Sequence, residues 1–315
     1  MPGLFFTEED VVNLHKDLRR MPPVEVSEEL RGWSYGAGVV SPPGGPLLGV
    51  SDVTGGFCDR GRDVYLRYAR RVPQRDNAIL QRGRLIHEVW MKTIVETKKA
   101  IYSAGLEASG NMLFTQLSSF KEKLKSESSA KYKLLDEGTI NWIIERIVNE
   151  GAATYSSALD RQLSRSRFME IDGVVAAVVP LLTEFPVSGE RIGLSRALRI
   201  DALLPPNLIL ELKTRNPRRE FELTLAGYAM AFESQYEFPV DHGILIYIEV
   251  DPEKRRLYVR PKILPIGDSL RSEFIDRRDK LVENILYDQD PGLSSNCPPD
   301  CPYLYYCRGG ADEPA

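Results

Sequence analysis

The sequence lacks an excess of positive charge, a long apolar run and a dense set of cysteines. Its 315 residues carry 41 lysines and arginines against 45 aspartates and glutamates, for a net charge of −4. This balance excludes a surface that is basic all over, although a local basic groove stays compatible with it. The longest apolar run, 174–182, contains Pro180 and is too short to span a bilayer, which takes about 20 residues.

Targeting and disulfide signals are scarce as well. The first ten residues contain neither the basic segment nor the apolar segment of a signal peptide. The sequence has only four cysteines, which does not fit a secreted disulfide scaffold. We therefore expect a cytoplasmic protein that does not insert into a membrane.

The composition that is present is typical of a folded globular chain, with 43% hydrophobic and 27% charged residues. The length predicts roughly two structural units or one enlarged domain. A capped helix is expected to begin near Thr7. No proline occurs between Pro73 and Pro180, and apolar residues recur every three or four positions from 79 to 94. This pattern predicts a helical block from 77 to about 150.

The periodicity changes in the second half, where apolar residues alternate as in strands. Strands are predicted at 173–182, 198–204, 208–213, 243–250 and 257–260, and helices at 219–234 and 269–287. The fold class is therefore α/β, with a β-rich core crossed by a helix and a large helical insertion or lobe attached to that core. We divide the chain into an N-terminal helical segment (1–76), a helical lobe (77–168), the core (169–288) and a cysteine-rich tail (289–315).

Two predicted strands flank the three-residue loop 205–207 and should form a hairpin. This loop length places Asp201 opposite Glu211, with Asn207 in a left-handed conformation and Lys213 on the same face as Glu211. Facing carboxylates repel each other, and a divalent cation between them would remove the repulsion. A nearby lysine suits phosphate chemistry, because it can orient a water and offset developing charge.

The alternative for this hairpin is an ordinary solvent-exposed face on which Glu211 and Lys213 form a surface pair. Matches to such short patterns arise often by chance. Both strands are otherwise strongly apolar, which argues against an exposed edge.

The cysteines are unevenly distributed. Cys297, Cys301 and Cys307 lie close together in the tail, whereas Cys58 stands alone far upstream. This distribution predicts one four-thiolate site that joins the tail to the N-terminal segment. Zinc and an iron–sulfur cluster both remain open from the spacing.

Taken together, these motifs resemble the iron–sulfur nucleases of the PD-(D/E)XK, RecB-like type. The resemblance is strongest to the CRISPR-associated Cas-four family, and within it to the longer archaeal type I-A form, the Csa-one group. The matching segments, in chain order, are 57–66 around the first cysteine, Gly83 to His87, 184–187, 199–201, 211–214 and Cys301 to Cys307.

The resemblance implies a restriction-endonuclease-like core with a mixed sheet, a C-terminal segment bound to an iron–sulfur cluster, and two cofactors. It implies that His87, Asp201, Glu211 and the Leu212 carbonyl bind Mg²⁺ or Mn²⁺, and that Asp201, Glu211 and Lys213 are catalytic. It also implies that Cys58, Cys297, Cys301 and Cys307 hold a [4Fe–4S] cluster. We expect this cluster to be structural.

The activity implied by the resemblance is a metal-dependent DNA exonuclease acting on single-stranded ends. Its role would be the trimming of prespacer DNA in CRISPR adaptation, alongside the integrase and its small partner subunit. One departure is that Thr224 stands where the family has a glutamine, although Tyr228 of the same motif is present. The polarity of cleavage and the oligomeric state stay open.

Two basic clusters flank the proposed ligands, as a phosphodiester substrate requires. They comprise Arg60, Arg62, Arg67, Arg70, Arg71, Arg75, Arg82, Arg84 and Lys92, and then Lys213, Arg215, Arg218 and Arg219. We expect Arg84, Arg215 and Tyr228 to contact DNA. For any single arginine, a solvated helix face is the competing interpretation.

Two other functions are compatible with the sequence. The first is a non-cutting subunit that binds DNA or the integrase, and the absent glutamine favours it. The second is a zinc-stapled structural protein or an electron carrier. That function explains the cysteines but leaves the acidic residues of the hairpin unexplained. His15 and His242 have no acidic or cysteine partner at ligand spacing, and we interpret both as structural or surface residues.

Overall fold

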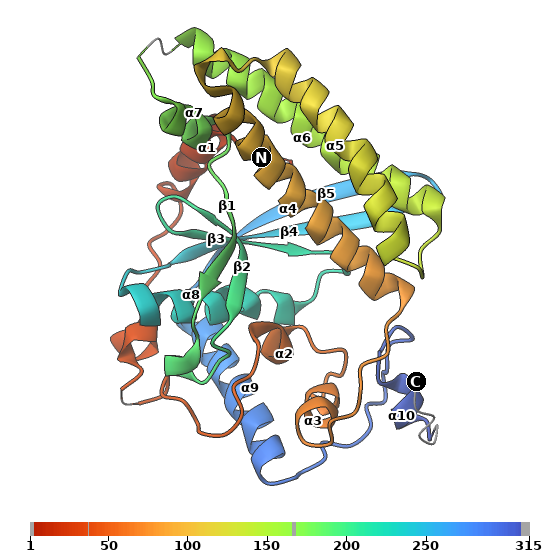
Figure 1. Cartoon of the computed structure of the whole chain (residues 1–315). Coiled ribbons are helices and arrows are strands. Elements are labelled where there is room, and N and C mark those ends of the chain that lie inside the picture. The colour runs from red at the N-terminus through yellow and green to blue at the C-terminus, as the bar shows by residue number, and fades with distance from the viewer. Residues whose placement is uncertain (1–2, 37, 166–167, 310–315) are drawn as a thin grey trace.

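A five-stranded mixed sheet forms the centre of the molecule in a computed structural model, which describes residues 3–36, 38–165 and 168–309 (Figure 1). Its strands are β1 (Leu182–Val187), β2 (Leu198–Leu204), β3 (Leu208–Lys213), β4 (His242–Asp251) and β5 (Arg256–Pro265). They lie in sequence order; β3 and β4 are parallel, and the other neighbours are antiparallel. The predicted α/β class with a mixed sheet is confirmed.

Helices cover both faces of this sheet. The described α-helices are α1 (Glu8–Leu18), α2 (Val50–Thr54), α3 (Arg62–Tyr68), α4 (Ala78–Ala104), α5 (Gly110–Lys131), α6 (Glu137–Arg165), α7 (Ile171–Val178), α8 (Leu223–Tyr236), α9 (Asp268–Leu286) and α10 (Leu304–Cys307). Short 3₁₀ helices occupy Glu28–Leu30, Gly32–Ser34, Gly105–Glu107, Glu190–Ile192 and Arg219–Phe221. Figure 1 shows α4, α5 and α6 on one side of the sheet and α8, α9 and α2 on the other.

Each face of the sheet has its own hydrophobic core. On one face, Trp90 of α4 and Ile147 of α6 pack in the same buried cluster as Leu210 of β3 and Ile246 of β4. The helical lobe is thus packed directly onto the sheet. The other face buries a second cluster, in which residues of α8 and α9 meet alternate residues of the same strands.

One predicted strand is wrong. Residues 173–182 were expected to be extended because they are apolar and β-branched, but most of them form helix α7, and β1 begins only at Leu182. Val174, Val175 and Val178 are buried in the lobe core, a spacing that fits one helical face. Tertiary packing therefore overrides the strand preference of valine here.

The hairpin of β2 and β3 has the predicted register, since Ala202 pairs with Leu210 and Leu204 with Leu208. The expected left-handed conformation of Asn207 is wrong. Prolines fix φ at the two preceding loop positions, and the Asn207 side-chain amide instead donates a hydrogen bond to the Pro239 carbonyl.

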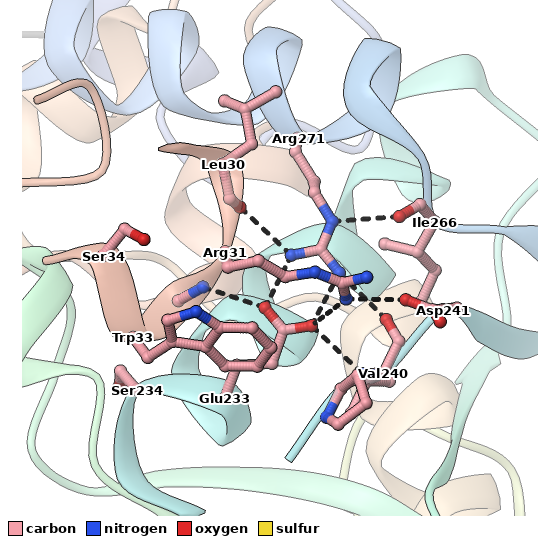
Figure 2. Close-up of polar contacts among 12 residues, drawn as sticks. Leu30, Arg31, Trp33, Ser34, Glu233, Ser234, Val240, Asp241, Ile266 and Arg271 are labelled. Carbon is pink, nitrogen blue, oxygen red and sulfur yellow. Dashed lines mark hydrogen bonds and ion pairs between the residues drawn. The ribbon is translucent and has the colours of Figure 1, made fainter. Parts of the chain in front are cut away.

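A buried ion pair joins α8 to α9 (Figure 2). Both carboxylate oxygens of Glu233 accept hydrogen bonds from the Arg271 guanidinium, at 2.7 and 2.8 Å, and both side chains are fully buried. The remaining Arg271 donors reach the carbonyls of Leu30, Val240 and Ile266. Every guanidinium N–H therefore has a partner, as a buried arginine requires.

The same carboxylate fastens the N-terminal segment to helix α8. Glu233 also accepts hydrogen bonds from Arg31 at 2.9 Å and from the Gly32 backbone at 2.8 Å (Figure 2). A Cβ atom at position 32 would lie 1.9 Å from the Met230 carbonyl oxygen. Glycine is required there because the two backbones approach so closely.

Among the described residues, no helix combines the length and the apolar character needed to cross a bilayer.

Candidate active site

Helix α4 carries the histidine of the site. The helix is capped by Asn77, whose side chain accepts a hydrogen bond from the Leu80 backbone at 2.9 Å. On the following turns Ile86 and Trp90 are buried in the lobe core. This anchoring sets the rotation of α4, and His87 Nδ1 lies 3.3 Å from Asp201 Oδ1.

A glycine one turn before His87 allows this approach. A Cβ atom at Gly83 would lie 2.8 Å from the Thr214 side-chain oxygen, just beyond the end of β3. The Gly-x-x-x-His motif therefore has a packing reason, because its glycine brings α4 against β3 while its histidine faces the acidic residues.

Strands β2 and β3 separate at the two acidic residues. Their ladder ends at the Ala202–Leu210 pair. Beyond it, the Asp201 backbone N–H donates to Glu211 Oε1 at 3.2 Å, and the Leu212 backbone N–H donates to Asp201 Oδ2 at 2.8 Å. The carboxylates thus accept hydrogen bonds from backbone N–H groups at the point where the ladder ends. These hydrogen bonds hold both side chains between the separated strands.

Lys213 completes the cluster that the sequence predicted. Its ammonium group donates to Glu211 Oε2 at 3.2 Å and lies 5.8 Å from the centre of the Phe221 ring. The Glu211 side chain is 5% exposed and that of Lys213 is 17% exposed. The interpretation of these residues as an ordinary exposed surface pair is therefore wrong.

The pKa values of the two acids shift in opposite directions, because His87 lies beside Asp201. Burial, reinforced by the negative charge of Asp201, raises the pKa of Glu211 to about 8. Burial acts in the same sense on Asp201, but the neighbouring His87 outweighs it and lowers the pKa of Asp201. Burial disfavours the imidazolium of His87, yet the pKa of His87 is raised because the Asp201 carboxylate outweighs that effect.

The donor chemistry of this cluster fits a divalent cation. It offers two carboxylates and an imidazole, which suit Mg²⁺ and Mn²⁺, and a cation would relieve the unfavourable charge on Glu211. Within the described ranges, no three His, Cys, Asp or Glu side chains form a preassembled ion site. The same oxygen atoms instead bond to His87, Lys213 and backbone N–H groups.

A pocket of about 760 Å³ opens over these residues and contains His87, Asp201, Glu211, Leu212 and Lys213 in its lining. The three residues predicted to contact DNA, Arg84, Arg215 and Tyr228, also line it. The sequence therefore predicted a set of residues that the structure brings together.

Those three residues are held differently. Arg84 is exposed and pairs with Asp76 at 3.1 Å. Arg215 lies 4.2 Å from the centre of the Phe57 ring and 3.3 Å from Asp300, and burial lowers its pKa. For Tyr228, burial and then the carboxylate of Glu211 raise the pKa above its usual range.

Sequence reasoning missed part of the pocket wall. Glu184 was noted as part of a motif but was not proposed as a site residue. It falls opposite Asp201 in the β1–β2 register, has a left-handed backbone with φ of 52°, and lines the pocket. The signal that would have identified it is that motif glutamate together with the strand pairing.

A second missed group lies on the helical lobe. Glu88 accepts hydrogen bonds from Lys131 and Tyr132 and pairs with Lys92 at 2.7 Å, and all four residues line the pocket. These contacts join α4 to the end of α5. They depend on tertiary packing, which no local sequence pattern predicts.

The residue at the motif-glutamine position does not face the pocket. Thr224 is buried, and its hydroxyl lies 2.9 Å from the Thr54 hydroxyl. It packs α8 against α2 rather than lining the site.

The four cysteines lie in one region, between the segment around α3 and the tail. Arg62 Nη1 is 3.1 Å from Cys307 Sγ, and Cys301 and Cys307 pack against a small core of Tyr65, Leu66 and Tyr303. Cys58 and Pro298, which follows Cys297, line one common pocket. Hydrogen bonds also tie the tail to the residues just before α4: the Arg75 backbone N–H donates to the Pro302 carbonyl at 3.3 Å, and the Asn77 side-chain amide donates to the Asp300 carbonyl at 2.9 Å.

The chemistry of these thiols fits a metal group. All four are free of disulfides. Burial raises the pKa of Cys58, and it raises the pKa of Cys301 to about 11. Such thiols are protonated until a metal displaces the proton. The described cysteines do not converge on a single-ion site.

The remaining histidines lie away from the pocket lining. His15 Nε2 is 3.1 Å from the Pro205 carbonyl oxygen on the hairpin loop. His242 begins β4 rather than preceding it, and burial lowers its pKa.

A mixed sheet whose parted strands present two carboxylates and a lysine, faced by a histidine, defines a carboxylate-based hydrolytic site of the kind found in nucleases. Comparison with known families then gives the particular assignment: the chain belongs to the family described as CRISPR-associated exonuclease Csa1, which matches residues 4–310. This membership confirms the prediction of an exonuclease enzyme and its link to CRISPR.

Two relatives carry that same description. A protein of Saccharolobus solfataricus is 37% identical over 310 residues, covering 97% of this chain and 100% of the relative. A protein of Thermoproteus tenax is 31% identical over 286 residues, covering 91% and 93% of the two chains. No solved structure matches the chain significantly.

Proposed function

We propose that this protein is a metal-dependent DNA exonuclease that acts on single-stranded ends and trims prespacer DNA in CRISPR adaptation. The observation that carries the proposal is the separation of β2 and β3 at Asp201 and Glu211, which gathers these acids with His87 and Lys213 in one pocket. The relatives named CRISPR-associated exonuclease Csa1 support the same reaction class.

The residues divide the work as follows. His87, Asp201, Glu211 and the Leu212 carbonyl would hold Mg²⁺ or Mn²⁺, which would activate a water and stabilise the negative charge that develops on the phosphate oxygens. Lys213 orients the attacking water and offsets charge on the phosphate oxygens.

Substrate positioning falls to the pocket wall. Arg84 and Arg215 pair with the phosphates that flank the cleaved bond. Tyr228 lines the same pocket as Asp201 and Glu211 and contacts the strand there.

The family assignment that we propose is finer than the one above. We place the chain among the Cas-four iron–sulfur nucleases with a PD-(D/E)XK core, in the type I-A branch. Cys58, Cys297, Cys301 and Cys307 hold a [4Fe–4S] cluster that fastens the tail to the α3 segment. The protein works in the cytoplasm with the CRISPR integrase and its small partner subunit.

A second candidate is a subunit that binds DNA or the integrase without cutting. The observation that favours it concerns Thr224, which stands at the motif-glutamine position. Its side chain is buried and contacts the Thr54 hydroxyl instead of lining the pocket. In that case the acidic cluster would serve in binding alone.

An end-labelled cleavage assay separates these functions. Single-stranded DNA labelled at either end is incubated anaerobically with cluster-loaded protein and Mn²⁺ or Mg²⁺. We expect wild type and the exposed-site control Glu253→Gln to shorten the DNA, and Glu211→Ala and Lys213→Ala to leave it intact. Cleavage by the Glu211→Ala, Lys213→Ala double variant would refute the site, and no cleavage by intact wild type would favour the binding subunit.

A further inference from the structure

A second pocket adjoins the active-site pocket. It has a volume of about 420 Å³ and shares Ile79, Thr214 and Arg215 with its neighbour. Its walls come from the start of α4, the loop after β3, the second half of β4, the middle of β5 and the cysteine-rich tail. The two pockets therefore lie next to each other, and these three shared residues line both of them.

The lining of this second pocket is basic. Two of its four arginines are neutralised locally: Arg215 pairs with Asp300 at 3.3 Å, and Arg260 pairs with Glu249 at 2.6 Å. Arg82 and Arg218 also line it, and neither forms an ion pair with any described residue. Both are half-buried, so the pocket holds two uncompensated positive charges away from full solvation.

These two arginines come from distant parts of the chain. Arg82 lies on the first turns of α4, and Arg218 lies at the end of the loop that follows β3. A solvated helix face explains a single exposed arginine, but it does not explain two unpaired arginines that meet in one cavity from separate elements. Their convergence is typical of a site for anions.

We infer that this basic pocket binds the backbone phosphates of the DNA strand next to the bond that is cut, with Arg82 and Arg218 as the phosphate-binding residues. The inference rests on the proposed function, because DNA is the substrate proposed there. Arginine forks match phosphate oxygens geometrically. Arg215, two residues after Lys213, lines both pockets and so links the basic pocket to the acidic cluster.

The binding of labelled oligothymidylate tests this inference without requiring cleavage. Fluorescence anisotropy is measured without divalent ions over a series of salt concentrations, using cluster-loaded wild type and the Arg82→Gln, Arg218→Gln double variant. Each phosphate contact on a single strand contributes about 0.7 to the salt slope, so the slope should fall by about 1.4 and the affinity by about 25-fold at 0.1 M salt.

Two further variants separate charge from fold. Arg82→Lys with Arg218→Lys keeps both charges and should retain most of the salt slope. Arg20→Gln with Arg256→Gln removes two exposed arginines that line neither pocket and should bind as wild type does. Equal melting temperatures of all variants confirm that the basic pocket is intact.

The outcomes distinguish this inference from the proposed function. Wild-type cleavage together with unchanged affinity and slope in the glutamine double variant would overturn the inference and leave the exonuclease standing. A fall in slope in a protein that never cuts DNA would support the pocket and refute the exonuclease. Absence of single-stranded DNA binding by wild type would overturn the inference.

Discussion

Replacing Glu211 by glutamine should stabilise the cation-free protein while abolishing its activity. Burial and the charge of Asp201 raise the pKa of Glu211 to about 8, whereas the ordinary value, which an unfolded chain retains, is 4.5. Between these two values the folded protein retains a proton that the unfolded chain releases. The free energy of unfolding of wild type therefore falls as the pH rises through this window, and the penalty is complete above pH 8.

The size of the effect follows from the shift. At pH 7 the penalty spans about 2.5 pH units, or roughly 3 kcal/mol at 1.36 kcal/mol per unit. Glutamine has no proton to release in the unfolded chain and escapes this penalty. For a chain of this length, with about 2.1 cal/mol/K of unfolding entropy per residue, the melting temperature should rise by about 5 °C.

Thermal melting of cluster-loaded protein checks the prediction, in buffer with a chelator of free divalent ions and at several pH values from 5 to 8. The advantage of Glu211→Gln over wild type should grow with pH, and near pH 5 it should be only about a quarter of its size at pH 7. Glu253→Gln, at an exposed turn position, should melt as wild type does. Added Mn²⁺ should raise the melting temperature of wild type more than that of Glu211→Gln. A variant that melts at or below the wild-type temperature at pH 7 would refute the reasoning.

Three further changes test other parts of the structure. Cys297→Ala should lose iron and lower the melting temperature by loosening the tail; retention of both iron content and melting temperature would contradict a structural cluster. Glu233→Gln should lower the free energy of unfolding in urea by about 3–5 kcal/mol, because it leaves the buried charge of Arg271 uncompensated; a change below 1 kcal/mol would show that this ion pair is dispensable. Gly83→Leu should push α4 away from Thr214 and reduce kcat by about 100-fold with little effect on folding, whereas wild-type kcat would show that this close approach is unnecessary.

Much of the fold was predictable because its strands and helices carry clear periodicity. The hairpin register followed from the loop length, since the last pair of the ladder, Ala202 with Leu210, directly adjoins Asp201 and Glu211. The same reasoning failed for 173–182, because valines that pack on one face of a helix are locally indistinguishable from valines of a buried strand.

The candidate site was predictable where it depended on spacing and unpredictable where it depended on packing. His87 and Lys213 stand in recognisable motifs. Glu88, Lys131 and Tyr132 line the pocket only because α5 ends beside α4. The same limit applies to the arginine network around Glu233, whose partners lie far apart in the sequence.

The packing of α4 has a consequence for how the protein loses structure. This helix supplies His87 to the pocket and, on the next turn, Trp90 to a core that also contains Leu210 of the hairpin strand β3. Amide protons of α4 and of β3 should therefore exchange with solvent only through the same large opening, as members of one cooperative unit. A truncated chain without the helical lobe would also lose the imidazole, so the lobe is as much a part of the active site as the sheet.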